Sequence, residues 1–251
     1  MNKKSYIGVF DSGIGGLNVL SNLIETFPNE NFLYIGDNLN VPYGIKSQQQ
    51  LEEIIKDIFN YFEKEDVKAI VVACNTASAA SENMTSLVPV FRIIEPTAIN
   101  ALKISNRIGV LATNFTIESK GYDKYLKDNM VGIKASPFVT IVENNTINEK
   151  ESLDIINKTL SKHKDNIDTI ILGCTHFSLL EKQIKDVLGN INIVDSSKSF
   201  NDILDKYLKE NDLYNDSNTN GDVKICFTKE DKINISWFDK KYNGINFINV
   251  K

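Results

Sequence analysis

The chain has 251 residues, of which 42% are hydrophobic and 24% charged, with a formal net charge of −5 and a pI near 5.2. This size and composition suit one large or two modest globular domains and exclude disorder over most of the chain. The acidic balance, with no long block of like charge, argues against a nucleic-acid partner and against an anionic membrane surface.

The first residues resemble the start of a secretion signal, but Asp11 interrupts the apolar stretch early. No apolar run approaches the roughly 18 residues that a membrane span needs. Three cysteines, an odd number, argue against a disulfide framework. We therefore expect a cytoplasmic protein without membrane contact.

Short β-branched runs alternate with amphipathic stretches, which is the pattern of βα units around parallel sheets. The clearest helix is predicted at 47–65, where apolar residues repeat at helical spacing opposite charged ones. The predicted fold class is α/β with doubly wound parallel sheets. Strands are predicted at 5–10, 31–36, 67–73, 90–94, 107–111, 131–136, 168–172 and 191–195.

The last part of the chain has a different pattern. Residues 209–222 are polar and rich in turn formers, so they predict a surface loop. Beyond them we predict a strand at 223–228, a helix at 230–242 with Ile233, Trp237 and Phe238 facing inward, and a strand at 245–250. Because about thirty residues cannot bury a core alone, we expect this segment to complete the first sheet.

Two cysteines lie in matched settings 100 residues apart. Cys74 and Cys174 each follow an apolar run and precede a predicted helix. A second pair of similar segments, Ile7 to Ser12 and Ile108 to Thr113, is separated by 101 residues. These two repeated pairs, in the same order along the chain, indicate two related halves. If the halves face each other, two thiols share one cleft, which suits chemistry on both faces of one carbon.

The cysteines and histidines differ in their expected roles. A helix N-terminus favours the thiolate over a free thiol with a pKa of about 8.5, so Cys74 and Cys174 are expected to be catalytic. Cys226 lies in a strand-like run and is expected to be a buried hydrophobe. His176 is placed to hold or relay a proton, whereas His163 is expected at the surface. A zinc site of Cys74, Cys174 and His176 is the weaker alternative because the usual ligand spacing is missing, so no metal is predicted.

Polar clusters fall after several predicted strands, where ligands bind in parallel sheets. The glycine loop after the first strand lacks the third glycine of the dinucleotide fingerprint, which would fall at Asn18. We therefore favour a small carboxylate over a nucleotide there, and a turn without a ligand stays open. The clusters are Asp11-Ser12-Gly13-Ile14-Gly15-Gly16, Gly36-Asp37 with Pro42-Tyr43-Gly44, Cys74-Asn75-Thr76, Thr113 with Thr116, Glu143, and Cys174-Thr175-His176.

Through these motifs, which run in order from residue 7 to 177, the chain resembles the glutamate racemases of the cofactor-independent aspartate/glutamate racemase superfamily. Two features depart from the family pattern. Ser178 replaces a usual proline, and Arg92-Ile-Ile-Glu95-Pro96-Thr97 is an unusual form of its stretch. These departures bear on domain packing and regulation more than on the chemistry.

The resemblance implies two doubly wound α/β domains related by a pseudo-twofold axis, with the active site between them and no cofactor. We place the discontinuous N-terminal domain at 1–96 plus 208–251 and the second domain at 97–207. The implied reaction interconverts L-glutamate and D-glutamate by a two-base cysteine mechanism. The product D-glutamate would supply peptidoglycan synthesis, and so cell wall biogenesis and cell shape, in a bacterial cytoplasm.

The family's residue roles carry over by position. The resemblance assigns deprotonation of D-glutamate to Cys74 and of L-glutamate to Cys174. The implied catalytic residues are Cys74, Cys174, Asp11, His176 and Glu143. The implied substrate-binding residues are Asp11, Ser12, Pro42, Tyr43, Gly44, Asn75, Thr76, Thr113, Thr116, Thr175 and His176.

Three other functions stay open. A racemase for aspartate or another acidic amino acid is the closest, because pocket depth sets the substrate's length. A dithiol redox protein would pair Cys74 with Cys174 but lacks a C-x-x-C motif. A small-ligand receptor of periplasmic shape would need an export signal. A homodimer and a monomer are equally compatible with the sequence.

Overall fold

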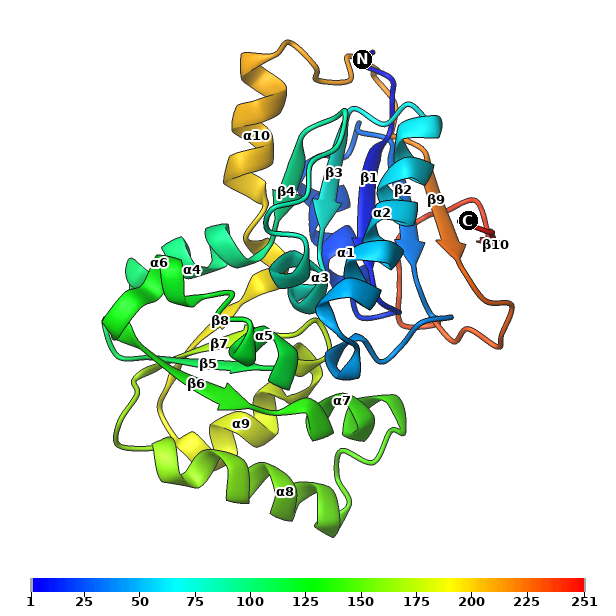
Figure 1. The fold of residues 1–251 in the computed structure, drawn as a ribbon. Coiled ribbons are helices and arrows are strands. Elements are labelled where there is room, and N and C mark those ends of the chain that lie inside the picture. The colour runs from blue at the N-terminus through cyan, green and yellow to red at the C-terminus, as the bar shows by residue number, and fades with distance from the viewer. Residues whose placement is uncertain (1, 251) are drawn as a thin grey trace. The chain divides into compact units, whose positions relative to one another are not determined.

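The structure is a computed structural model that describes residues 2–250 (Figure 1). The described residues divide into two compact units. One unit contains the residues up to Ile93 together with those from Ser197 on, and the other is Ile94–Ser196. Within the described chain, no helix is both long enough and apolar enough to cross a membrane.

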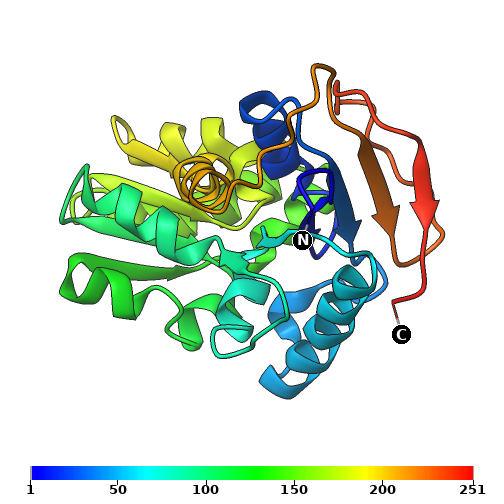
Figure 2. The ribbon, with the colours of Figure 1, turned by 90° about the horizontal axis from the view of Figure 1, so that it is seen from above.

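Within residues 2–250, the first unit contains a six-stranded parallel sheet in the order β10-β9-β2-β1-β3-β4. Its central strands are buried along their whole length, which explains their continuous apolar sequences. Figure 2 shows α1 (Leu17–Thr26) and α2 (Gln48–Lys64) on opposite faces of this sheet. The strands are β1 (Ile7–Asp11), β2 (Phe32–Gly36), β3 (Ala69–Val72), β4 (Val90–Arg92), β9 (Val223–Phe227) and β10 (Ile245–Phe247).

Helix α2 confirms the predicted helix at 47–65. Ser47 begins it with a capping box, in which its hydroxyl accepts from Gln50 N and the Gln50 side chain accepts from Ser47 N. The buried face includes Phe62, and a Cβ on Gly8 would lie 2.7 Å from the Phe62 ring. Glycine at position 8 therefore lets the helix lie directly on β1.

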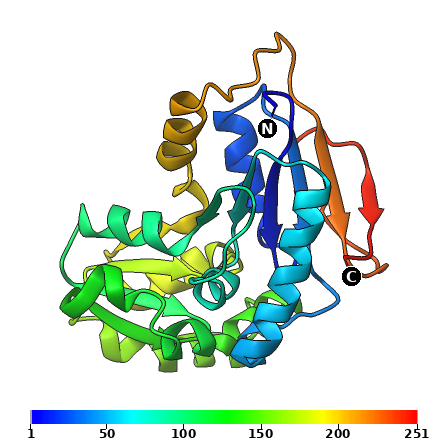
Figure 3. The same ribbon diagram turned by 45° about the horizontal axis from the view of Figure 1, so that its top comes forward.

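The C-terminal strands complete the first sheet. β9 pairs with β2 and β10 pairs with β9, at the edge of the sheet seen in Figure 3. The predicted helix at 230–242 is wrong, because this segment is irregular. The Asn234 side chain accepts hydrogen bonds from the backbone N–H and the hydroxyl of Ser236, which favours a turn over a helix. Phe238 is buried as predicted, but Trp237 is exposed.

Helix α10 (Asn201–Glu210) belongs to the first unit, whereas the sequence boundary placed most of it in the second domain. Tyr207 donates a hydrogen bond to the Lys68 carbonyl at 3.0 Å, and its ring lies 5.3 Å from that of Phe91. These contacts hold α10 against β3 and β4. The charge pattern of a solvent-exposed helix does not reveal which sheet it covers.

Within the described residues, the second unit contains a four-stranded parallel sheet in the order β6-β5-β7-β8. Figure 1 shows α8 and α9 on one face of this sheet and α4 and α6 on the other. Its strands are β5 (Ile108–Ala112), β6 (Met130–Lys134), β7 (Thr169–Gly173) and β8 (Asn192–Asp195). The remaining α-helices are α3 (Asn75–Ala80), α4 (Ile94–Leu102), α5 (Asn114–Glu118), α6 (Asp123–Leu126), α7 (Ser136–Glu143), α8 (Lys150–Leu160) and α9 (Glu181–Leu188). Short 3-10 turns lie at Tyr43–Ile45, Lys127–Asn129, Ser161–His163, Phe177–Leu180 and Ser196–Lys198.

The two units repeat one strand order. β2-β1-β3-β4 in the first sheet corresponds to β6-β5-β7-β8 in the second, with the first strand of each unit next to its second and third. The parallel sheets with helices on their faces confirm the predicted α/β class. Cys74 follows β3 and Cys174 follows the equivalent strand β7. The two similar sequence segments therefore occupy equivalent positions in the topology of the two units.

Candidate active site

Cys74 lies at the junction between β3 and α3, as predicted. It is the N-cap residue of α3, and its sulfur accepts a hydrogen bond from Ala77 N at 3.5 Å. The Cys74 thiol also lies 3.7 Å from the Ser12 hydroxyl, which it reaches as a donor. Cys74 is 6% exposed. Its sulfur is held by a backbone donor and by the neighbouring loop after β1.

Asp11 organises that neighbouring loop. It is the last residue of β1 and is fully buried, and its Oδ2 accepts from Gly13 N at 3.1 Å and from Gly16 N at 3.0 Å. A Cβ on Gly16 would lie 2.3 Å from the Asp11 Cβ, so position 16 has no room for a side chain. These loop N–H groups bind the chain's own aspartate, in the place that a phosphate takes in a nucleotide-binding loop.

A second buried carboxylate, Asp37, holds the loop that contains Tyr43. Asp37 accepts from the Tyr43 hydroxyl at 2.6 Å, from the Thr228 hydroxyl at 2.6 Å and from the amide of Asn40 at 2.9 and 3.1 Å. Burial and the nearby Asp37 raise the pKa of Tyr43 well above its usual range, so the phenol remains a donor. Pro42, which follows a cis peptide bond, is exposed beside it.

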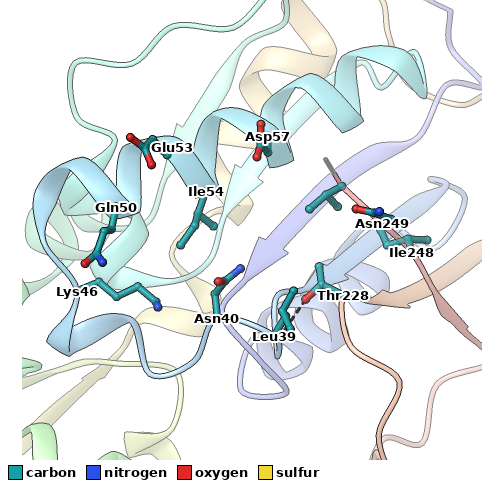
Figure 4. Close-up of a pocket in the computed structure, with 11 residues that line it drawn as sticks. Leu39, Asn40, Lys46, Gln50, Glu53, Ile54, Asp57, Thr228, Ile248 and Asn249 are labelled. Atoms are coloured by element: carbon teal, nitrogen blue, oxygen red, sulfur yellow. Dashed lines mark hydrogen bonds between the residues drawn. The ribbon is translucent and has the colours of Figure 1, made fainter.

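The sequence did not point to Thr228. It follows β9 and reaches a residue 191 positions earlier in the chain. A cavity of 610 Å³ lies beside this network, between α2 and the chain after β9 and β10. Figure 4 shows Asn40, Lys46, Ile54 and Thr228 around it.

In the second unit, Cys174 begins a row of three side chains. Its sulfur lies 3.6 Å from Nδ1 of His176, and the other ring nitrogen of His176, Nε2, lies 3.5 Å from a carboxylate oxygen of Glu143. The His176 ring is buried, whereas the Glu143 side chain is 39% exposed. The imidazole thus connects a half-buried thiol with a carboxylate that reaches solvent.

Two local predictions about this group are wrong. Cys174 precedes a tight turn and a 3-10 segment instead of opening an α-helix, and Phe177 N donates to the Cys174 carbonyl at 3.0 Å. Glu143 is the last residue of α7 and does not follow a strand. The turn is what brings His176 back towards Cys174 within two residues.

The remaining predicted residues are buried polar groups near strand ends. Thr113 is the N-cap of α5, and its hydroxyl accepts from Thr116 N at 3.3 Å and lies 3.0 Å from the Thr116 hydroxyl. Asn75 and Thr76 form the first turn of α3, and Thr175 follows Cys174. Gly44 is half-buried next to Tyr43.

The departures from the family pattern have local structural roles. The Ser178 hydroxyl donates to the Thr175 carbonyl at 3.2 Å, within the turn that contains His176. Arg92 donates to the Ser81 hydroxyl and to the Met84 carbonyl. The Ser178 bond closes the turn that contains His176, and the Arg92 bonds hold the segment that follows α3.

Each unit therefore contains one cysteine at a strand end and a set of polar residues in the same unit. In the first unit the group contains Asp11, Ser12, Tyr43, Cys74, Asn75 and Thr76. In the second it contains Thr113, Thr116, Glu143, Cys174, Thr175 and His176. A thiol with a carboxylate nearby and neutral donors around it is equipped for proton transfer on a small anionic molecule.

Comparison with known proteins agrees with this chemistry. The family described as Asp/Glu/Hydantoin racemase matches residues 7–199. Glutamate racemase from Thermoanaerobacter pseudethanolicus is 40% identical over 219 residues, which cover 83% of each chain. Glutamate racemase from Aquifex aeolicus is 38% identical over 230 residues, or 88% of each chain.

Solved structures are similar along nearly the whole chain. Glutamate racemase from Thermus thermophilus, in complex with β-chloro-D-alanine, has a TM-score of 0.86 and 30% identity. The Francisella tularensis enzyme, in complex with D-glutamate, has a TM-score of 0.88 and 27% identity. Both comparisons cover 99% of this chain and 98% of the other. The chain therefore belongs to the Asp/Glu/hydantoin racemase family, and these four relatives are glutamate racemases.

Proposed function

We propose that this protein interconverts L-glutamate and D-glutamate, with Cys74 and Cys174 as its two acid–base groups. The observation that carries the proposal is the repeated placement of a cysteine after the equivalent strands β3 and β7, with the Ser12 hydroxyl beside Cys74 and the His176–Glu143 pair beside Cys174. The D-glutamate complex of the Francisella tularensis relative supports the choice of substrate.

Inversion at Cα needs two groups because one base tends to return the proton to the face from which it came. In the proposed reaction, the thiolate of one cysteine removes the Cα proton, and the thiol of the other donates its proton to the opposite face. The roles exchange in the reverse direction. Sulfur suits this task because a free thiol has a pKa of about 8.5, within reach of neutral pH.

The Cys74 side acts on D-glutamate in this proposal. Asp11 faces the substrate ammonium and helps to orient the proton at Cys74, and the two glycine N–H groups fix its carboxylate. Ser12, at 3.7 Å from the thiol, sets the direction of the S–H bond. A carboxylate held in this way needs no rearrangement during the proton transfer.

The Cys174 side acts on L-glutamate. His176 accepts the thiol proton at Nδ1 and leaves Cys174 as the thiolate. Glu143 stabilises the resulting imidazolium across the 3.5 Å contact at Nε2. A histidine suits this step because its usual pKa of about 6.5 lies close to neutral pH, so it can both accept and release a proton there.

Neutral donors recognise the substrate carboxylates in this proposal and hold the charge that develops when the Cα proton leaves. Their amide and hydroxyl groups are buried at the strand ends, where competing water is limited. The backbone of Tyr43 and the adjacent residues Pro42 and Gly44 complete the proposed substrate-binding surface. The donor side chains are Ser12, Asn75, Thr76, Thr113, Thr116 and Thr175.

Incubation of the purified protein with L-glutamate in D₂O, without added cofactor, tests the proposal. We expect D-glutamate with deuterium at Cα, and we expect Cys74→Ala and Cys174→Ala each to abolish racemisation. Cys226→Ala is the matched control and retains the activity. Racemisation that persists in both single-site variants would refute the two-thiol mechanism, and turnover of L-aspartate in preference to L-glutamate would reassign the substrate.

We further propose that the D-glutamate formed supplies peptidoglycan synthesis in the cytoplasm, and that the protein works as a homodimer. Growth of a D-glutamate auxotroph that carries this gene, without added D-glutamate, tests the first point. Sedimentation of the purified protein tests the second. An auxotroph that still needs D-glutamate, or a sedimentation coefficient typical of a monomer, would contradict the respective statement.

A further inference from the structure

We propose that Tyr34 is a positioning residue for proton transfer at Cys74, because its hydroxyl fixes the loop that contains Asp11 and Ser12. The inference rests on the proposed role of Cys74. Tyr34 lies in the middle of β2 and is fully buried, and its hydroxyl is bonded to a backbone carbonyl of the loop, so we assign it a positioning role and no substrate contact.

The Tyr34 hydroxyl donates a hydrogen bond of 2.5 Å to the Gly13 carbonyl. Gly36, two residues further along β2, points to the same face of the sheet. A Cβ on Gly36 would lie 2.7 Å from that same carbonyl oxygen. β2 therefore presents a hydroxyl and a bare Cα to one peptide group, and both determine where the loop lies.

The opposite side of the Gly13 residue is also held, since its N–H donates to Asp11. The peptide units around Gly13 are thus fixed between Tyr34 and Asp11. Ser12 lies between Asp11 and Gly13 in the chain, with its hydroxyl 3.7 Å from the Cys74 sulfur. A shift of Gly13 would therefore move Ser12 relative to the thiol and loosen the Asp11 carboxylate.

The Tyr34 side chain is well suited to hold this place. Burial, with Asp11 and Cys74 nearby, raises the pKa of Tyr34 well above its usual range, so the phenol keeps its proton and remains a donor. The ring of Phe227 from β9 packs against the ring of Tyr34 in a T-shaped arrangement, with ring centroids 6.2 Å apart. The ring is fixed by packing and the hydroxyl by the loop carbonyl.

Tyr34→Phe removes the hydroxyl and keeps the ring. Tyr207→Phe is the matched control, because Tyr207 also donates from its hydroxyl to a backbone carbonyl, that of Lys68, at the end of β3 away from Cys74. We expect both variants to lower Tm. Only Tyr34→Phe is expected to lower kcat, by about 10- to 100-fold with a small change in KM, because small misplacements of reacting groups are costly.

Isotope effects identify the affected step. The two enantiomers have equal free energy, so kcat/KM must stay equal in the two directions whatever the mutation does. If the step at Cys74 is slowed, the deuterium isotope effect on kcat/KM increases for Cα-deuterated D-glutamate, whose deuteron Cys74 removes. It decreases for Cα-deuterated L-glutamate, because removal by Cys174 is then no longer limiting.

A Tyr34→Phe variant with wild-type kcat per folded molecule, or with isotope effects changed equally for both enantiomers, would overturn the inference while leaving the proposed function intact. Absence of racemisation in the wild type would overturn both. If Tyr34→Phe does not fold, Phe227→Leu keeps the hydroxyl and removes the ring that supports Tyr34. It should show the same isotope asymmetry with a smaller loss of kcat, and unchanged kinetics would overturn the inference.

Discussion

Asp11 and Asp37 show how single residues build this site. Both carboxylates are buried at strand ends, and both accept several hydrogen bonds from nearby donors. Such bonds offset the cost of removing a charge from water and make the carboxylate a fixed acceptor. Each aspartate thereby fixes a loop, and each loop contains a residue proposed to act on the substrate.

His176→Asn tests the proton path in the second unit. We expect kcat/KM to fall by about 10²- to 10⁴-fold, equally in both directions, because a positioned acid–base group contributes that much. The isotope effect should increase for Cα-deuterated L-glutamate, since the step at Cys174 becomes limiting. Steady-state kinetics with both deuterated enantiomers measure this. His163→Asn is the control, and equal kinetics for the two variants would contradict the role of His176.

Cys226 should resist alkylation in the folded protein. Burial raises its pKa to about 11, so the reactive thiolate is scarce at pH 8 and forms only as the pH approaches that value. Mass spectrometry after iodoacetamide treatment at pH 8 should find Cys174, which is half-buried, modified well before Cys226. Modification of Cys226 as fast as in the denatured chain would show that the strand does not protect it.

The sequence singled out candidate site residues that belong to compact motifs, and it missed the residues that hold those candidates in place. Asp11, Cys74 and His176 stand out as candidates because the chain places them next to glycines or strand ends. Thr228 gave no such signal, because it is one threonine at the end of a strand, and its partner is distant in sequence. Tyr34 has the pattern of any buried strand residue.

At the level of secondary structure elements, a buried ion pair holds the base of the first sheet. Lys68, fully buried immediately before β3, contacts Glu30 and donates to the carbonyls of Lys3 at 2.6 Å and Leu213 at 2.9 Å. Glu30 also accepts from Asn215 N at 2.8 Å. All three ammonium N–H groups thus have acceptors, and the pair attaches the segment after α10 to β3.

Lys68→Met should destabilise the fold strongly, because it leaves the Glu30 carboxylate buried without its cation. We expect a loss of about 3–5 kcal/mol in the free energy of unfolding. The double variant Glu30→Gln with Lys68→Met should recover much of that loss, since no buried charge remains. Urea unfolding of both variants measures the difference, and equal stabilities would show that the unpaired charge is not the cause.

The elements themselves were predictable where one physical signal dominated. Strands β1 to β3 and β5 are continuous apolar runs, and α2 has a complete helical repeat with a capping box. The segment 230–242 has apolar residues at helical spacing as well, but its Asn234 turn competes successfully. A hydrophobic pattern alone does not report such local side-chain bonds.

On the scale of the whole molecule, one unit is continuous in sequence and the other is not. Residues 94–196 contain a hydrophobic core of their own, around Leu111, Phe138, Ile170 and Phe177. The first unit joins two segments, because β2 pairs with β9 from the far end of the chain. We propose that these units are the folding domains of the protein.

A fragment of residues 94–196 should therefore fold alone, with cooperative thermal unfolding as in other small domains. A fragment of residues 1–93 should not, because β2 lacks its partner β9 and Lys68 lacks its acceptor in the 211–222 segment. Circular dichroism and proton–nitrogen correlation spectra of the two fragments compare these outcomes. A stable, dispersed spectrum from residues 1–93 would disprove the dependence on the C-terminal strands.

The pairing of β9 with β2 also determines when the first sheet can be completed during synthesis on the ribosome. β9 begins 187 residues after β2 ends. At a translation rate of about 5–20 residues per second, about 10 to 40 s pass between the synthesis of β2 and that of β9. During that interval the strand offers an open hydrogen-bonding edge to other nascent chains. The inserted unit is completed first, so chaperone demand should fall on the earliest-made residues of the polypeptide.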